Sequence, residues 1–135
     1  PYPGIPELLD RLRKSGVQVA IVSNKPDPTT KALAQKFFPG VPAFGQRDDL
    51  PPKPAPDLVL HALAVLDCPR ESAIYVGDSE VDVLTAHNAA VPCLSVLWGF
   101  RDRAEIQAAG ESRFCETPAQ MPAMLEEMMK ELDNG

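Results

Sequence analysis

Three short segments of this sequence carry side chains suited to phosphate and metal chemistry. Ser23–Lys25 directly follows the apolar run Val17–Val22, Gly77–Ser79 follows Ala73–Val76, and Lys53 lies between them in a proline-rich stretch. A hydroxyl beside backbone N–H groups can bind a phosphoryl oxygen. An ammonium restrained by prolines can neutralise charge that develops on a transferring phosphoryl group. Carboxylates are preferred ligands of Mg²⁺. Together the three segments indicate a site for a phosphorylated anion.

Each segment also has an ordinary structural interpretation. Asp78 and Asp82 are four residues apart, so both carboxylates can point into one crevice, but Ser79-x-x-Asp82 also matches a helix capping box. Ser23–Lys25 can be a polar turn before a helix that begins at Asp27-Pro28. Lys53 can be a solvated loop lysine. Only the combination, in this order along the chain, favours chemistry.

The elements that must position these residues alternate between helices and strands. Gly16 is expected to stop the first helix. The second helix carries Leu33 and Phe37 on one apolar face, and residues 47–56 form a loop. The spacing of apolar residues predicts helices near residues 5–12, 28–38, 56–66, 79–90, 102–109 and 118–132. It predicts strands at residues 17–22, 43–46, 73–76, 93–98 and 113–115.

This alternation is typical of one α/β domain over residues 1–135, with a Rossmann-like parallel sheet and helices on both faces. In such sheets, ligands bind beyond the carboxyl ends of the strands. The segments that follow the strands are therefore expected to meet at one edge of the sheet.

Composition excludes several classes of function. The 135 residues carry 13 Lys and Arg against 19 Asp and Glu, a net charge of −6, with no basic stripe, so nucleic acid is not an expected partner. No apolar stretch is long enough for a membrane span. Cys68, Cys93 and Cys115 have no metal-binding spacing and are expected to be reduced, which favours a cytoplasmic protein.

The order of the motifs resembles the haloacid-dehalogenase-like hydrolase superfamily, and in particular its phosphoglycolate-phosphatase-like branch. The matching segments are VAIVSNK at residues 19–25, KPAPD at 53–57, YVGDSEVD at 75–82 and TAHNAAVPCLSVLWGFR at 85–101. The resemblance covers nearly the whole chain.

The resemblance implies roles for individual residues. Ser23 would bind a phosphoryl oxygen, and Lys53 would hold the phosphoryl group and steady a nucleophilic aspartate. Asp78 would bind Mg²⁺, Asp82 would be a second ligand or support the first, and Asn24 and Ser79 would line the site. The family reaction is attack by an aspartate on phosphorus, followed by hydrolysis of the aspartyl-phosphate.

One family feature is missing from this chain. The first motif of the family is an apolar strand that ends in Asp-x-Asp, and no such pair follows a strand here; Asp48-Asp49 lies in a loop. The small cap domain is also missing. We therefore expect the chain to be the C-terminal part of a longer enzyme, inactive alone. Loss of a central strand is expected to weaken it, or to make it pair with a second copy or with the missing segment.

The sequence thus predicts a Mg²⁺-dependent phosphatase for a small phosphorylated metabolite, with this chain carrying the phosphate- and metal-binding half of the site. Two alternatives stay open. One is a phosphomutase of the same superfamily. The other is a non-catalytic α/β module that binds phosphate or a partner.

Overall fold

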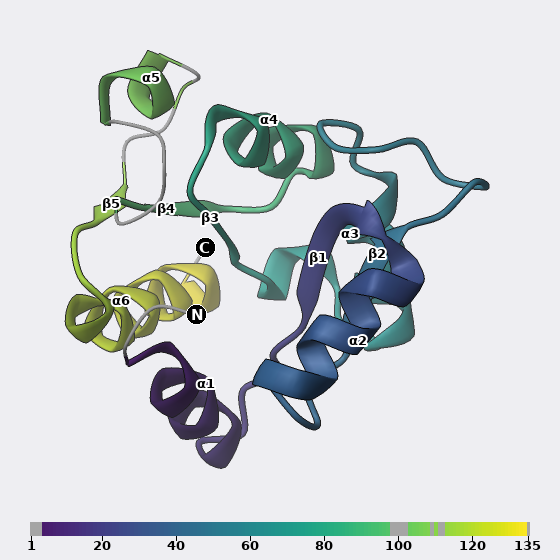
Figure 1. Cartoon of the computed structure of the whole chain (residues 1–135). Coiled ribbons are helices and arrows are strands. Elements are labelled where there is room, and N and C mark those ends of the chain that lie inside the picture. Colours follow the sequence, from purple (N-terminus) through teal and green to yellow (C-terminus); the bar gives the residue numbers. More distant parts are fainter. Residues whose placement is uncertain (1–3, 98–102, 109, 111–112, 135) are drawn as a thin grey trace.

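The strands of the computed structural model are all parallel, but they form two separate sheets (Figure 1). The structure describes residues 4–97, 103–108, 110 and 113–134. One sheet pairs β1 (Ile21–Pro26) with β2 (Ala43–Gln46). The other has the order β3 (Tyr75–Gly77), β4 (Cys93–Val96), β5 (Phe114–Cys115). The predicted α/β class is confirmed, and the expected single sheet is divided between β1 and β3.

Helices cover both faces of the β3–β5 sheet. The α helices are α1 (Ile5–Lys14), α2 (Asp27–Phe37), α3 (Asp57–Val65), α4 (Glu80–Ala89), α5 (Arg103–Ala108) and α6 (Met121–Asn134). Short 3₁₀ turns lie at Arg70–Ser72 and Pro118–Gln120. Leu94 packs with Leu8 of α1 and Leu125 of α6, whereas Cys93 packs with Val83 of α4 and Ile106 of α5. Both faces of this sheet are therefore covered by apolar contacts.

The β1–β2 sheet is covered by α2 and α3, which lie on its two faces (Figure 1). Phe44 of β2 is buried against Leu58 and Ala62 of α3. Val59 of the same helix packs against Ala89 and Val91, which belong to the half of the fold that contains the β3–β5 sheet. Helix α3 therefore bridges the two sheets.

Most predicted elements are found where the sequence placed them, with two corrections. The first strand begins at Ile21, not at Val17, because its pairing with β2 begins at Ile21↔Ala43 and residues 17–20 have no partner strand. The predicted strand at 73–76 shifts to Tyr75–Gly77 for the same reason, since only these residues lie opposite β4. The ends of the predicted strand 93–98 and helix 102–109 lie partly outside the described residues.

The prediction of the apolar face of the second helix was also wrong. Leu33 and Phe37 are each 40% exposed, and α2 instead buries Thr30 and Ala34. Small side chains face the sheet because Gly45 of β2 lies directly below the helix: a Cβ on Gly45 would come within 2.5 Å of the Asp27 Cα atom. Gly16 follows α1 with a φ of 89°, as expected for a glycine that ends a helix.

The three cysteines are free; Cys93 and Cys115 are buried, and Cys68 is half-buried. Burial raises the pKa of the Cys115 thiol. Among the residues described, no helix is both long and apolar enough to cross a bilayer.

Candidate active site

The carboxyl ends of β1 and β3 converge on one residue, Lys53, whose backbone contacts Asn24 and whose side chain contacts Tyr75. The lysine lies in the loop between β2 and α3, and its Nζ atom is 2.9 Å from Asp82 Oδ1. The two side chains are only 13% and 10% exposed, so the ion pair is largely shielded from water. The structure thus brings together two residues that are 29 positions apart and that the sequence placed in separate motifs.

Tyr75 completes this pair, although sequence reasoning assigned it no role. Its hydroxyl donates to Asp82 Oδ1 at 2.9 Å and lies 3.2 Å from Lys53 Nζ, which donates to it. Burial and the nearby Asp82 carboxylate raise the pKa of Tyr75, so the phenol stays protonated. A buried tyrosine hydroxyl needs a polar partner. That requirement is a signal that the sequence offered, because Tyr75 lies within an otherwise apolar run.

The second oxygen of Asp82 is also fully engaged. Asp82 Oδ2 accepts the backbone N–H of Asp78 at 3.0 Å and the hydroxyl of Ser79 at 3.1 Å. In return, the Ser79 hydroxyl accepts the N–H of Asp82 at 3.3 Å and caps α4. The capping interpretation of this segment is therefore correct, and it coexists with the ion pair to Lys53.

Electrostatics favour an ionised Asp82. Burial alone would raise the pKa of its carboxyl, but the charge of Lys53 and the hydrogen bonds from Lys53, Asp78 and Tyr75 outweigh burial and lower it. Gly77 makes this arrangement sterically feasible. A Cβ atom on Gly77 would lie 2.3 Å from the Cβ of Asp82, a distance that real side chains do not adopt.

Two asparagines fix the backbone beside the lysine. Asn24 Oδ1 accepts the N–H of Lys53 at 2.9 Å, and Asn24 Nδ2 donates to the Lys53 carbonyl at 3.4 Å. Asn88 of α4 donates to the carbonyl of Pro54 at 2.8 Å. Asn24 therefore clamps the lysine loop, and Asn88, which the sequence analysis did not single out, holds it from the opposite side.

Ser23 lies within β1, so the expectation that Ser23–Lys25 follow the strand was wrong, whereas Asp78 directly follows β3. The pairing of β1 with β2 is irregular between Val22 and Pro26, so Ser23–Lys25 departs from the regular ladder. Such irregularities are common beside active sites. The Ser23 hydroxyl accepts the N–H of Lys25 at 3.1 Å and has no described contact with Lys53. Asp78 is half-buried at the start of the turn into α4.

The donors present fit a Mg²⁺ site in part. Mg²⁺ is usually held by one or two protein carboxylates together with water and phosphate oxygens. Asp78 and Asp82 both offer a carboxylate, and four hydrogen-bond donors occupy both oxygens of Asp82. Within the described ranges, no group of three or more His, Cys, Asp or Glu side chains is placed to hold a metal. The contacts of Asp82 make it the residue that positions Lys53.

Comparisons with known proteins agree with this arrangement of motifs. The chain is 41% identical over 105 residues to a phosphoglycolate phosphatase of Rhodobacter capsulatus, an alignment that covers 74% of this chain and 46% of that protein. It is 30% identical over 137 residues to a phosphoglycolate phosphatase of Agrobacterium fabrum, covering 96% of this chain and 57% of the relative. The chain thus spans about half the length of the curated relatives it matches.

Solved structures share the fold. One from Lactobacillus delbrueckii subsp. bulgaricus superposes with a TM-score of 0.87 at 38% identity, covering 96% of this chain and 53% of that one. A hydrolase from Pseudomonas syringae superposes with a TM-score of 0.81 at 28% identity, covering 93% and 61%. The family described as haloacid dehalogenase-like hydrolase matches residues 1–96. The resemblance drawn from the motifs is confirmed, and the chain belongs to the haloacid dehalogenase-like hydrolase family.

Proposed function

We propose that the complete protein is a Mg²⁺-dependent phosphatase that hydrolyses a small phosphate monoester, as its phosphoglycolate phosphatase relatives suggest. This chain would contribute the phosphate- and metal-binding half of the site. The observation that carries the proposal is the restrained ammonium of Lys53, which is held by Asp82 and Tyr75 where the carboxyl ends of β1 and β3 meet.

A restrained ammonium is suited to phosphoryl transfer. Charge accumulates on the phosphoryl oxygens in the transition state, and a positive group already in place stabilises it without reorganisation. The proposal gives this role to Lys53, with Asp82 and Asn24 fixing its position. The Ser23 hydroxyl and the backbone around it would donate to the phosphoryl oxygens, and Ser79 would line the site.

Asp78 would hold Mg²⁺, which when bound supplies positive charge beside the phosphoryl group. The nucleophile of the proposed reaction is an aspartate from outside this chain. Its carboxylate attacks phosphorus, the bond from phosphorus to the ester oxygen breaks, and that oxygen takes a proton from an acid outside this chain to leave as the alcohol. Water then attacks the aspartyl-phosphate, which releases inorganic phosphate and restores the carboxylate.

The test is phosphate release by the complete natural polypeptide from a panel of small phosphate esters that includes 2-phosphoglycolate, with and without Mg²⁺. We expect metal-dependent release from at least one ester. Lys53→Ala should lower kcat by at least about a hundredfold, because it removes a preorganised charge. Asp78→Ala should raise the Mg²⁺ concentration needed for half-maximal rate.

Lys14→Ala is the matched control, because Lys14 is a surface lysine whose side chain is 77% exposed and paired with Asp10. It should leave kcat unchanged. No release from any ester by a folded protein that binds Mg²⁺ would contradict the proposal and favour a mutase or a binding module. Near-normal turnover in Lys53→Ala would show that the lysine does not stabilise the transferring phosphoryl group.

A further inference from the structure

Asparagine side chains from both halves of the fold bond to the backbone of the loop that carries Lys53. Asn24 of β1 accepts the Lys53 N–H at 2.9 Å and donates to the Lys53 carbonyl at 3.4 Å. Asn88 of α4 donates to the Pro54 carbonyl at 2.8 Å. Because a proline has no N–H, these three hydrogen bonds engage every backbone polar group of Lys53 and Pro54.

The residues on either side of this pair close the loop into a tight turn. The Ala55 N–H donates to the Pro52 carbonyl at 3.0 Å, so Lys53 and Pro54 occupy the two central positions of a four-residue turn. The closed turn moves as one unit. A hydrogen bond to the Pro54 carbonyl therefore also restrains the point at which the lysine side chain begins.

Helix α4 restrains the lysine at two separate points. Asp82, in the first turn of the helix, is 2.9 Å from the ammonium, and Asn88, in the last turn, bonds to the carbonyl of the following residue. Six helical positions correspond to about 9 Å along the helix axis. The two contacts therefore restrain different parts of the lysine, one its charged end and the other its backbone.

The direction of the ammonium matters because its donors are few. An ammonium has three N–H groups, and two of them go to Asp82 Oδ1 and to the Tyr75 hydroxyl. These described contacts leave one N–H for a phosphoryl oxygen. In a tetrahedral ammonium the direction of that N–H is set by the other two and by the bond to the lysine side chain, and hence by the position of the turn.

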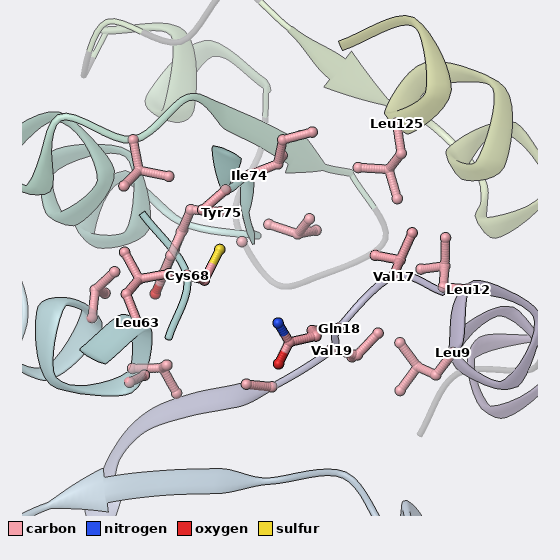
Figure 2. Close-up of a pocket in the computed structure, with 18 of the residues that line it drawn as sticks. Leu9, Leu12, Val17, Gln18, Val19, Leu63, Cys68, Ile74, Tyr75 and Leu125 are labelled. Atoms are coloured by element: carbon pink, nitrogen blue, oxygen red, sulfur yellow. The ribbon is translucent and has the colours of Figure 1, made fainter. Parts of the chain in front are cut away.

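Lys53 borders a pocket of about 830 Å³ between the two sheets. Tyr75 of β3 and Val19, which precedes β1, also line this pocket (Figure 2). On the pocket side, the described residues hold the lysine by hydrogen bonds and an ion pair, and not by close packing. The bonds to the turn backbone therefore contribute much of its restraint.

We propose that Asn88 is a positioning residue of the phosphatase: it holds the turn that directs the Lys53 ammonium at the transferring phosphoryl group. Asn88 acts through the Pro54 carbonyl and does not itself contact the phosphoryl group. The catalytic part of this inference rests on the proposed function, whereas the restraint of the lysine rests on the contacts alone.

Helix stability gives no alternative reason for an asparagine at this position. Asn88 is exposed in the last turn of α4, and asparagine has a lower helix propensity than alanine. Its described hydrogen bond goes to the turn and not to the helix. Asn88→Ala is therefore expected to leave α4 intact while it releases the turn.

Kinetics of the complete natural polypeptide test the catalytic part. With an ester that the natural protein hydrolyses in Mg²⁺, Asn88→Ala should lower kcat about tenfold and change KM less than about twofold, because the ammonium is misplaced while the other phosphate contacts remain. Asn88→Asp has nearly the same shape but no N–H to donate, and should lose at least as much. His87→Ala, at the neighbouring exposed position, is the matched control and should keep the natural kcat.

A double variant separates positioning from a general structural role. If Asn88 acts through the lysine, Lys53→Ala/Asn88→Ala should have the kcat of Lys53→Ala to within about twofold. A further tenfold loss in the double variant would show that Asn88 acts by another route and would overturn the inference. The natural kcat in both Asn88 variants would also overturn it.

Reactivity of the lysine tests the restraint without any activity measurement. The Lys53 side chain is 13% exposed, whereas that of Lys14 is 77% exposed and serves as the internal reference. Limited acetylation with acetic anhydride, followed by mass spectrometry of proteolytic peptides, should modify Lys53 at least about threefold faster, relative to Lys14, in Asn88→Ala than in the natural protein or His87→Ala.

Equal acetylation of Lys53 in all three proteins would overturn the inference, because the turn would then not depend on Asn88. The two tests can fail separately. If the natural polypeptide releases phosphate from no ester, the proposed function fails, and the acetylation rates still decide whether Asn88 restrains the lysine.

Discussion

Strands β1 and β4 differ in how far the rest of this chain buries them and pairs with them. All four residues of β4 are buried, and the strand lies between β3 and β5. In β1, the first three residues are half-buried, the last three are exposed, and β2 is the one strand that pairs with it in the described part of the chain. The apolar run before and within β1, at residues 17–22, is at least as rich in β-branched residues as that of β4. Local sequence therefore defines where a strand can form, and the neighbouring strands decide how far it is buried.

Lys53 is the side chain that ties the two halves together, so removing it should have the largest effect. Lys53→Met would leave Asp82 as a shielded carboxylate without its counter-ion. We expect the free energy of unfolding to fall by about 3–5 kcal/mol. Urea denaturation of the 135-residue chain, followed by circular dichroism, measures this loss.

The double variant Lys53→Met/Asp82→Asn is the control for that experiment. The neutral amide needs no counter-ion and its carbonyl oxygen can still accept hydrogen bonds, so the double variant should regain part of the lost stability. If the losses in unfolding free energy of the two single substitutions simply add in the double variant, the ion pair does not couple the two halves.

Amide hydrogen exchange should compare the local stability of the two sheets directly. The amides of Ser95 and Leu97 donate to Arg113 and Cys115, within a layer that is buried on both faces. Residues 18–20, in contrast, precede β1 and pair with no strand among the described residues. We expect the former to exchange at least about a hundredfold more slowly, because local opening is easiest where contacts are few. Equal protection in the two regions would contradict the difference drawn between them.

Tyr75→Phe should have a smaller effect. It removes one donor to Asp82 but leaves the contact of that carboxylate with Lys53. We expect a loss of about 1–2 kcal/mol in unfolding free energy, as for a hydrogen bond to a charged group. Phe114→Leu offers a comparison in which an aromatic ring is lost from the β3–β5 half without loss of a site hydroxyl. In the complete enzyme, Tyr75→Phe should lower kcat more than it changes KM.

Asp27 should give the smallest effect, one confined to the β1–β2 half. Hydrogen bonds from Lys31 and from the Gly45 N–H lower the pKa of its carboxyl below the ordinary value of 3.8. The Asp27 carboxyl therefore binds a proton more readily in the unfolded chain than in the folded one. Ionised Asp27 accordingly stabilises the fold at pH values above its ordinary pKa. The stability difference between the natural chain and Asp27→Asn should shrink as the pH falls through the lowered pKa. Thermal melts of both chains from neutral to acid pH measure it, and a constant difference would exclude the titration.

The sequence predicted the element order because helical and strand periodicities alternate clearly and because Gly16 and the prolines mark their ends. The central strand that the resemblance implied to be missing agrees with the gap between the two sheets. The shift of β1 from residues 17–22 to Ile21–Pro26 could not be predicted, since it depends on the pairing with β2. At the site, the motifs predicted Ser23, Asn24, Lys53, Asp78, Ser79 and Asp82 as candidates, but they did not indicate that Asn24 clamps the loop backbone. Nor could they show that Asp82 pairs with Lys53, because a contact between residues 29 positions apart requires the fold.

The central claim is that the site at Lys53 is half of an active centre whose other half lies outside this chain. Phosphate release from 2-phosphoglycolate and other small esters, measured in Mg²⁺ for the 135-residue chain and for the complete polypeptide side by side, tests it most directly. The account predicts release by the complete protein and none by the chain alone. Metal-dependent release by the isolated chain at a comparable rate would contradict it.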